Sequence, residues 1–137
     1  MGDIEKYLTK VPDFLLYFGV SIALLAVFIF IYTLVTPHKE FKLIKEGKAS
    51  AGISLIGSIL GFVLPLASLI IHSSNILDLI LWAIVALIVQ IIVFFIIRLI
   101  FIRDLSTKIS ENNISCGILV GGLSFIAGII NAVCLIP

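Results

Sequence analysis

Histidine and cysteine are the side chains in this sequence best suited to hold a metal ion or to form a disulfide, and the chain contains two of each. His38 and His72 fall at opposite ends of the second of four apolar segments, so one molecule cannot bring them to a common metal ion. Cys116 and Cys134 lie 18 residues apart in one apolar segment. In a helix that spacing is a rise of about 27 Å, far beyond disulfide reach. The sequence therefore predicts no metal site and no cofactor.

Catalytic and nucleic-acid-binding patterns are also missing from the sequence. It contains no nucleophile elbow, no phosphate-binding glycine loop, no dinucleotide-binding turn and no CxxC pair. Its net charge of +1 is too small for a nucleic-acid-binding protein, which needs a concentrated basic face. We therefore expect a protein that is not an enzyme and has no nucleic-acid partner.

Polar side chains inside the apolar segments are the remaining candidates for function. Gln90 lies in the middle of the third segment and Asn131 in the second half of the fourth. Within a membrane each must bond to another helix or contact a substrate or ion. Arg98, near the end of the third segment, either extends to the interface or pairs with Glu40 or Glu46. No acidic residue lies deep in a segment, which disfavours a proton- or cation-coupled transporter.

Four long apolar segments position these residues. They are 14–36, 49–71, 76–102 and 114–136, in a chain that is 61% hydrophobic and 12% charged with a mean hydropathy of +1.31. A transmembrane helix needs about 20 apolar residues, and uninterrupted apolar runs lack the alternation of a membrane β-barrel. The sequence therefore predicts an all-α polytopic membrane protein, with residues 1–137 forming a single domain in the lipid bilayer.

Charged residues gather in two loops that resemble each other. "TPHKEFKLIKEGKASAG" covers residues 36–52, and "RDLSTKISENNISCG" covers residues 103–117. At an offset of 65 residues Glu46 aligns with Glu111 and Ser50 with Ser115. The sequence therefore predicts two tandem helical hairpins, at about residues 13–72 and 78–137, that form a parallel repeat.

Basic residues predict the orientation of the chain in the membrane. Seven Lys and Arg residues lie in or beside the two charged loops, and the other two lie near the N-terminus. Basic residues stay on the cytoplasmic side, so we expect both loops to face the cytoplasm and both termini to face outward. Tyr17, Tyr32 and Trp82 lie near segment ends, where amphipathic rings prefer the membrane interface.

Small and polar residues form one stripe on the second segment and another on the fourth. Their steps of four and three residues place each stripe on one helix face, where small residues let membrane helices approach closely. The stripes either pack the centre of the bundle or line a polar path or subunit contact. Pro65 removes the donor for the Gly61 carbonyl, and we expect Ser68 or Asn131 to replace it. The candidate packing or path residues are Ser54, Ser58, Gly61, Pro65, Gln90, Gly121, Ser124, Gly128 and Asn131.

A series of motifs resembles a known family. "TPHKEFKLIKEGKASAG", "LGFVLPLAS", "ENNISCGILVGG" and "AGIINAVC" occur in this order, and they resemble the YjfL-like family of bacterial inner-membrane proteins of unknown function. The resemblance implies a four-helix protein of the bacterial inner membrane with a link to membrane homeostasis. Lys48 stands where the resemblance implies Asn, which the second repeat retains as Asn113. The candidate functional loop residues are Thr36, Pro37, His38, Glu40, Gly47, Glu111 and Asn113.

Two functions remain open from the sequence. One is a non-enzymatic, oligomeric membrane module that serves envelope homeostasis or anchors a cytoplasmic protein through the loop 37–48. The alternative is a small oligomeric channel or passive transporter whose Ser/Gly/Asn stripes line a central path. The two loops and the stripes distinguish these functions: alanine at Lys39, Glu40, Lys42 and Lys45 should abolish partner binding in the first, and leucine at Ser58 and Ser124 should block flux in the second.

Overall fold

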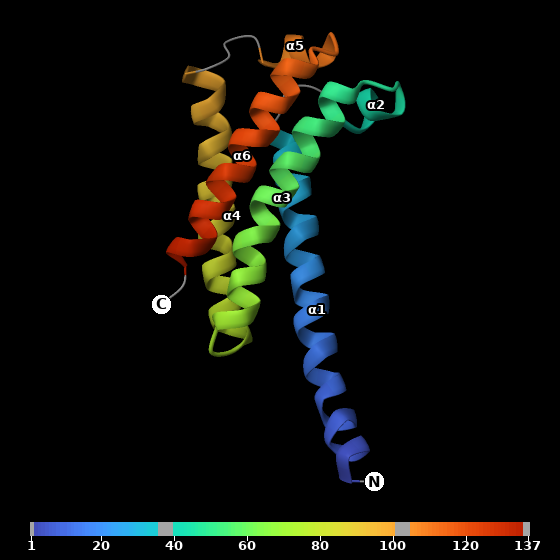
Figure 1. The fold of residues 1–137 in the computed structure, drawn as a ribbon, viewed down its shortest axis with the longest axis vertical. Helices are drawn as coiled ribbons and strands as arrows, with labels where there is room; N and C mark the ends of the chain where they lie inside the picture. Colours follow the sequence, from blue (N-terminus) through green and yellow to red (C-terminus); the bar gives the residue numbers. More distant parts are fainter. Residues whose placement is uncertain (1, 36–39, 101–104, 136–137) are drawn as a thin grey trace.

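The computed structural model describes residues 2–35, 40–100 and 105–135, and within these ranges all regular structure is helical. The elements are α1 (Gly2–Val35), α2 (Glu40–Lys45), α3 (Ala49–His72), α4 (Ile76–Ile100), α5 (Leu105–Ser110) and α6 (Ile114–Cys134) (Figure 1). Four of these helices, α1, α3, α4 and α6, are long and apolar enough to cross a membrane. The predicted all-α polytopic fold is confirmed.

The short helices and the chain termini lie toward opposite ends of the bundle (Figure 1). We call α2, α5 and the turns that follow them the cap, comprising residues 40–48 and 105–113. At the opposite end, residues 73–75 join α3 to α4 in a tight connection, and we call this the hairpin end. The cytoplasmic location of the cap stays a prediction from the distribution of Lys and Arg.

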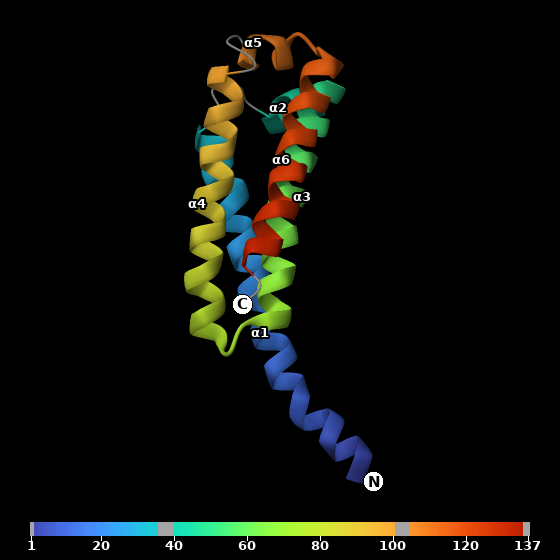
Figure 2. The same cartoon turned by 60° about the vertical axis from the view of Figure 1, so that its left-hand side comes forward.

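α3 and α6 pack against each other along most of their lengths (Figure 2). Glycines make this contact close: a Cβ atom at Gly57 would collide with the backbone of Gly121, and one at Gly128 with the backbone of Gly61. Position 57 meets 121 and position 61 meets 128, so the two helices run parallel. Membrane helices gain packing energy from such close approach, because lipid gives them no hydrophobic driving force.

Aromatic side chains connect α1 to α3 and to α4. The ring of Phe28 stacks on that of Phe62 with centroids 4.7 Å apart, and Tyr32 meets the edge of Phe94 at 5.3 Å. Pairs of this kind stabilise a fold by about 0.5–1.5 kcal/mol beyond the area they bury. The remaining faces of α1 and α4 expose large apolar side chains, as helices in contact with lipid do.

α1 begins twelve residues before the predicted apolar segment. Residues 2–13 continue the helix beyond the rest of the bundle at the hairpin end (Figure 1). Ile4, Tyr7, Leu8 and Val11 recur at helical spacing among charged residues, and all four side chains are exposed. The prediction from continuous hydropathy missed this extension because its apolar residues are periodic and not contiguous.

Replacing Gly57 by Ala should weaken the α3–α6 contact, because the added methyl group overlaps the backbone of Gly121. We expect the free energy of unfolding in mild detergent to fall by about 1–3 kcal/mol, the usual cost of overpacking. Gly52→Ala is the matched control, since a Cβ atom there meets nothing within 4 Å. Titration with a denaturing detergent, followed by circular dichroism, measures the free energy of unfolding of both variants. Equal values for Gly57→Ala and Gly52→Ala would contradict the close contact.

Candidate functional site

The structure places the candidate residues in two connected regions. One is a set of buried polar side chains between the long helices, which we call the polar seam: Tyr32, Ser54, Ser58, Gln90 and Ser124. The other is the cap. Thr36, Pro37, His38 and the side chain of Arg98 lie outside the described residues.

Hydrogen bonds join the polar seam across four helices, α1, α3, α4 and α6. The Ser58 hydroxyl lies 3.2 Å from the Tyr32 hydroxyl and 3.4 Å from that of Ser124, and it is also 2.9 Å from the Ser54 carbonyl oxygen. Gln90 Nε2 donates to the Ser124 carbonyl oxygen at 3.2 Å. These side chains are at most 4% exposed. The serine stripes therefore face the inside of one chain, not the outside of the bundle.

Glu40 closes the polar seam at the cap end. It is the first residue of α2, only 2% of it is exposed, and its carboxyl group hydrogen-bonds to the Tyr32 hydroxyl. A buried carboxylate is costly unless donors surround it. Tyr32 is 1% exposed, so its ring lies inside the bundle, and its depth at the membrane interface stays a prediction. The ring packs inward because its hydroxyl bonds to Glu40 and the α3 serines.

Ser68 and Asn131 donate hydrogen bonds to other groups than the predicted Gly61 carbonyl oxygen. The Ser68 hydroxyl donates to the Ala132 carbonyl at 3.1 Å, and Asn131 Nδ2 donates to the Ala86 carbonyl at 3.4 Å. The expectation that one of them would donate to the Gly61 carbonyl was therefore wrong. The backbone of Gly128 lies against that carbonyl oxygen, and the approach of α6 leaves no room for a side chain there.

The turns that follow α2 and α5 have the same hydrogen bonds. Lys48 N donates to the Leu43 carbonyl at 2.9 Å, and Asn113 N donates to the Lys108 carbonyl at 2.9 Å. The preceding residues, Gly47 and Asn112, have φ angles of 81° and 61°. Both turns thus have the helix-ending arrangement in which a left-handed residue follows the last turn. This similarity extends the predicted repeat to the backbone of the loops; repetition of whole hairpins stays a prediction.

The two repeats differ at the start of the helix that follows each turn. Asn113 precedes α6, and its Oδ1 accepts a hydrogen bond from Cys116 N at 3.2 Å. Lys48 holds the same position before α3 and makes no such side-chain bond. The first repeat therefore lacks the helix-capping side chain that the second has.

A side chain of the second loop takes the place of this missing helix-capping side chain. Asn112 Oδ1 accepts from Ser50 N at 3.1 Å, and the Ser50 hydroxyl donates to the Ile109 carbonyl at 2.6 Å. Ser50 and Ile109 are both fully buried. These bonds fix the first turn of α3, directly after the first loop, to the α5 turn of the second loop. The sequence pattern aligned Ser50 with Ser115 and gave no signal of a contact between the loops.

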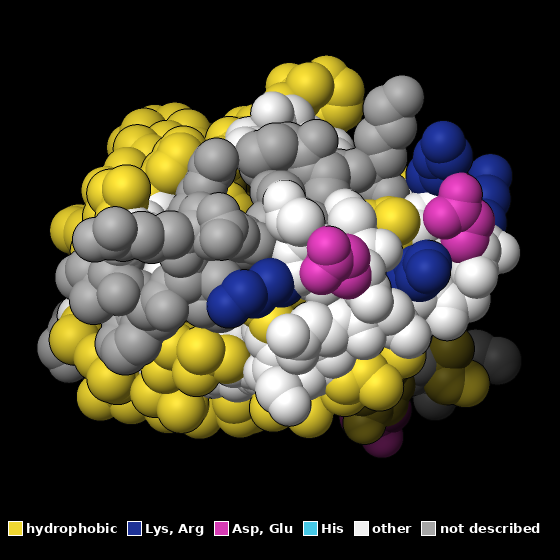
Figure 3. Space-filling model, turned by 90° about the horizontal axis from the view of Figure 1, so that it is seen from above, with side chains coloured by type: hydrophobic (Ala, Val, Ile, Leu, Met, Phe, Trp, Pro, Cys, Tyr) yellow, Lys and Arg dark blue, Asp and Glu magenta, His cyan; other side chains and the backbone are white. Residues whose placement is uncertain are grey.

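Separate Lys and Glu side chains stand on the outer surface of the cap (Figure 3). Glu111 is exposed there, whereas Glu40 is enclosed beneath it. Among the described residues, no cluster of His, Cys, Asp and Glu could hold a metal ion. The exposed charged residues of the cap are Lys42, Lys45, Glu46, Lys108 and Glu111.

Comparison with known proteins gives a family match over nearly the whole chain. The family described as "Domain of Unknown Function (DUF350)" matches residues 6–135. The UPF0719 inner membrane protein YjfL of Escherichia coli strain K12 is 38% identical over 119 residues, which cover 87% of this chain and 89% of that protein. The protein of the same name from Escherichia coli O157:H7 gives the same values. No solved structure matches.

Replacing Tyr32 by Phe should destabilise the bundle while leaving its shape intact. The change removes the hydroxyl that contacts Glu40, Ser54 and Ser58 and leaves a buried carboxyl group without that donor. We expect a loss of about 1–3 kcal/mol in the free energy of unfolding. Tyr7→Phe is the control, because Tyr7 is exposed on the α1 extension. Detergent denaturation would compare them, and an unchanged Tyr32→Phe midpoint would rule out a stabilising role for the polar seam.

Replacing Lys48 by Asn should give α3 the helix-capping side chain that it lacks. Lys48 already has the extended backbone of a capping residue, with φ −79° and ψ 98°, close to the −75° and 97° of Asn113. We expect a gain of about 0.5–1 kcal/mol, and Asn113→Ala should cost a similar amount. If Lys48→Asn is neutral in the same denaturation assay, Asn112 already satisfies the first turn of α3.

Proposed function

This chain belongs to the family described as Domain of Unknown Function (DUF350), and we propose that it is a non-enzymatic inner-membrane protein that anchors a cytoplasmic protein through its cap. Its role in this proposal is to maintain the cell envelope. The observation that carries the proposal is the attachment of the second loop to the first turn of α3, directly after the first loop, through the bonds from Ser50 to Ile109 and Asn112. A surface that is ordered before binding loses less entropy when a partner docks.

The exposed side of α2 has the chemistry of a protein-binding surface. Phe41 is 53% exposed and Ile44 38% exposed, and Lys42 and Lys45 lie beside them on the same short helix. Aromatic anchors surrounded by polar residues are typical of the centre of an interface. Glu40 and Leu43 are buried beneath and hold α2 in place. The predicted contribution of this loop to partner binding therefore comes from its outward residues, and Glu40 supports them from within.

Self-association is a further part of the proposal. The α1 extension carries Ile4, Tyr7, Leu8 and Val11 on one exposed stripe, beyond the reach of the other helices (Figure 1). Stripes at this spacing pair with the same stripe of another helix. We propose that copies of the chain associate through this segment in a homo-oligomer.

A small oligomeric channel or passive transporter is the alternative function. The observation that favours it is the polar seam, in which Gln90 Oε1 is buried and has no hydrogen-bonding partner among the described residues. Against it, the seam hydroxyls bond to one another within one chain and are sealed from solvent. A conducting path would require α3 and α6 to separate at their glycine contacts, and we therefore favour the anchoring function.

Photo-crosslinking from the cap in intact cells tests the anchoring function. A photoreactive residue replaces Phe41, and we expect it to form an adduct with a soluble cytoplasmic protein. Replacing both Lys42 and Lys45 by Glu should reduce that adduct several-fold, since charge pairs steer and hold partners. The same probe at Ile4, which is exposed at the opposite end of the chain, is the control and should give no such adduct. Adducts with lipid or other copies of the chain alone would contradict the proposal.

Ion and solute flux from proteoliposomes tests the alternative. We expect no flux above that of empty vesicles. A flux that Ser58→Ala changes would support the channel instead, because that substitution removes one seam hydroxyl and little volume. Alanine is preferable to leucine here, since Ser58 is buried and a larger side chain would overpack the bundle.

A further inference from the structure

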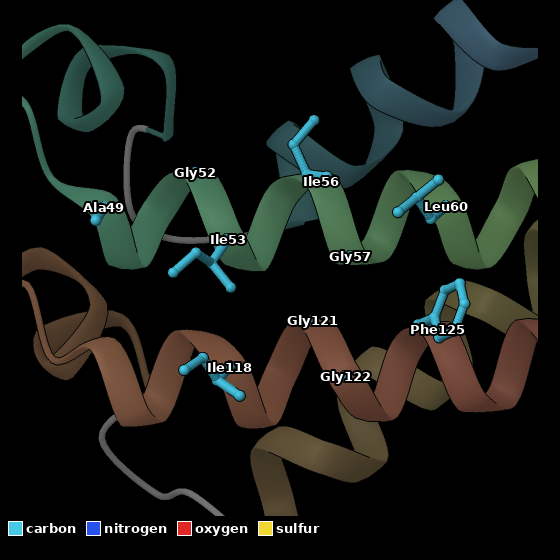
Figure 4. A pocket seen from close by; sticks show the side chains of 10 residues that line it. All are labelled: Ala49, Gly52, Ile53, Ile56, Gly57, Leu60, Ile118, Gly121, Gly122 and Phe125. Atoms are coloured by element: carbon cyan, nitrogen blue, oxygen red, sulfur yellow. The ribbon is translucent and has the colours of Figure 1, made fainter.

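An open apolar groove runs between α3 and α6 on the surface of the bundle (Figure 4). Its volume is about 660 Å³, within the range of roughly 300–1,000 Å³ that is common for small-molecule sites. It begins at Ala49, beside the cap, and extends to Leu60 and Phe125. Eleven helical residues rise by about 16 Å, so the groove reaches about the middle of the hydrocarbon core.

Gly57 and Gly121, where the two backbones touch, form the floor of this groove, and the other lining residues flank it (Figure 4). Gly52 and Gly122 lie on its outer flanks, where a Cβ atom would meet nothing within 4 Å. Ile56 on α3 and Ile118 on α6 rise at the two sides, and both are exposed. The glycine-rich contact that brings the two helices together thus leaves this groove on their outer side.

Basic residues border the cap end of the groove. Lys48 directly precedes Ala49, and Lys45 is the last residue of α2, one turn earlier in the chain. The long flexible stem of a lysine lets its ammonium group reach toward a neighbouring anion. Lys42, Lys45, Lys48 and Lys108 outnumber the exposed acids of the described cap, Glu46 and Glu111.

From the apolar groove and the charge at its end, we infer that this surface binds an anionic phospholipid, one acyl chain in the groove and the head group at Lys48 and Lys45. The groove is apolar along its length and ends where the phosphates of a bilayer leaflet would lie. Each juxtamembrane lysine strengthens binding to anionic lipid roughly fivefold. The lipid site shares Lys45 with the proposed anchoring surface, but its apolar part lies on the outer sides of α3 and α6, away from that surface.

An acyl chain suits this groove better than a helix from a second copy. A helix is about 10 Å wide, so it would rest on the walls formed by Ile56, Leu60, Ile118 and Phe125. It would leave the floor at Gly57 and Gly121 without contacts, which forfeits dispersion energy. A single hydrocarbon chain is narrow enough to touch both the floor and the walls.

Native mass spectrometry of the full chain in mild detergent tests this site, with phosphatidylglycerol and phosphatidylethanolamine as probes. We expect one phosphatidylglycerol per chain to be retained in preference to phosphatidylethanolamine. Gly122→Leu fills the groove and should lower this occupancy about tenfold. Lys48→Gln should lower it about fivefold. Gly19→Leu is the matched control, since position 19 is exposed on α1 and a Cβ there meets nothing within 4 Å.

Equal retention of phosphatidylglycerol by Gly122→Leu and Gly19→Leu would overturn the inference. Equal retention of the two lipids would overturn the assignment of the head group to the lysines. A dimer that Gly122→Leu dissociates would assign the groove to a second copy of the chain and would also overturn it. Circular dichroism checks that the variants fold, and Gly52→Leu fills the groove from the other helix if Gly122→Leu does not fold.

Discussion

Direct packing of the α3 backbone on the α6 backbone is the contact on which the rest of the structure depends. Gly57 meets Gly121 and Gly61 meets Gly128, so no side chain can stand between the two helices. Hydroxyl and amide groups beside these glycines are therefore held against other protein atoms and must bond to each other, which produces the polar seam. On the outer side of the α3–α6 pair, away from the polar seam, the same close approach leaves the apolar groove. One packing arrangement accounts for both the polar interior and the hollow exterior of the pair.

This contact also determines the shape of the cap. Because α3 and α6 run parallel and start at the same end, the turns that precede them lie side by side, and Ser50 reaches Ile109 and Asn112. Glu40 extends the arrangement to α1 through Tyr32. The loops between the spans therefore form a folded surface attached to the membrane helices, as a docking platform requires.

The four spans and the two small-residue faces were predictable, because each depends on a local pattern of composition or spacing. The inward position of Tyr32 was not, since it depends on a carboxyl group that arrives from α2. The bond between Ser50 and Asn112 joins residues 62 positions apart, which no local pattern contains. The α1 extension was missed because its apolar residues are periodic among charges. The family match is consistent with a membrane protein and adds no activity, so function rests on the geometry of the cap and the seam.

Thiol labelling in intact cells tests the central claim most directly, that the chain is a closed bundle presenting its cap to the cytoplasm. Single cysteines would replace Lys45 on the cap and Ser58 or Ser124 in the seam, in a background where Cys116 and Cys134 are alanine. The account predicts that a membrane-permeant maleimide labels position 45, that an impermeant maleimide does not, and that neither labels positions 58 and 124. Rapid labelling of the seam positions would show a water-filled path, and impermeant labelling of position 45 would place the cap outside; either result would contradict the account.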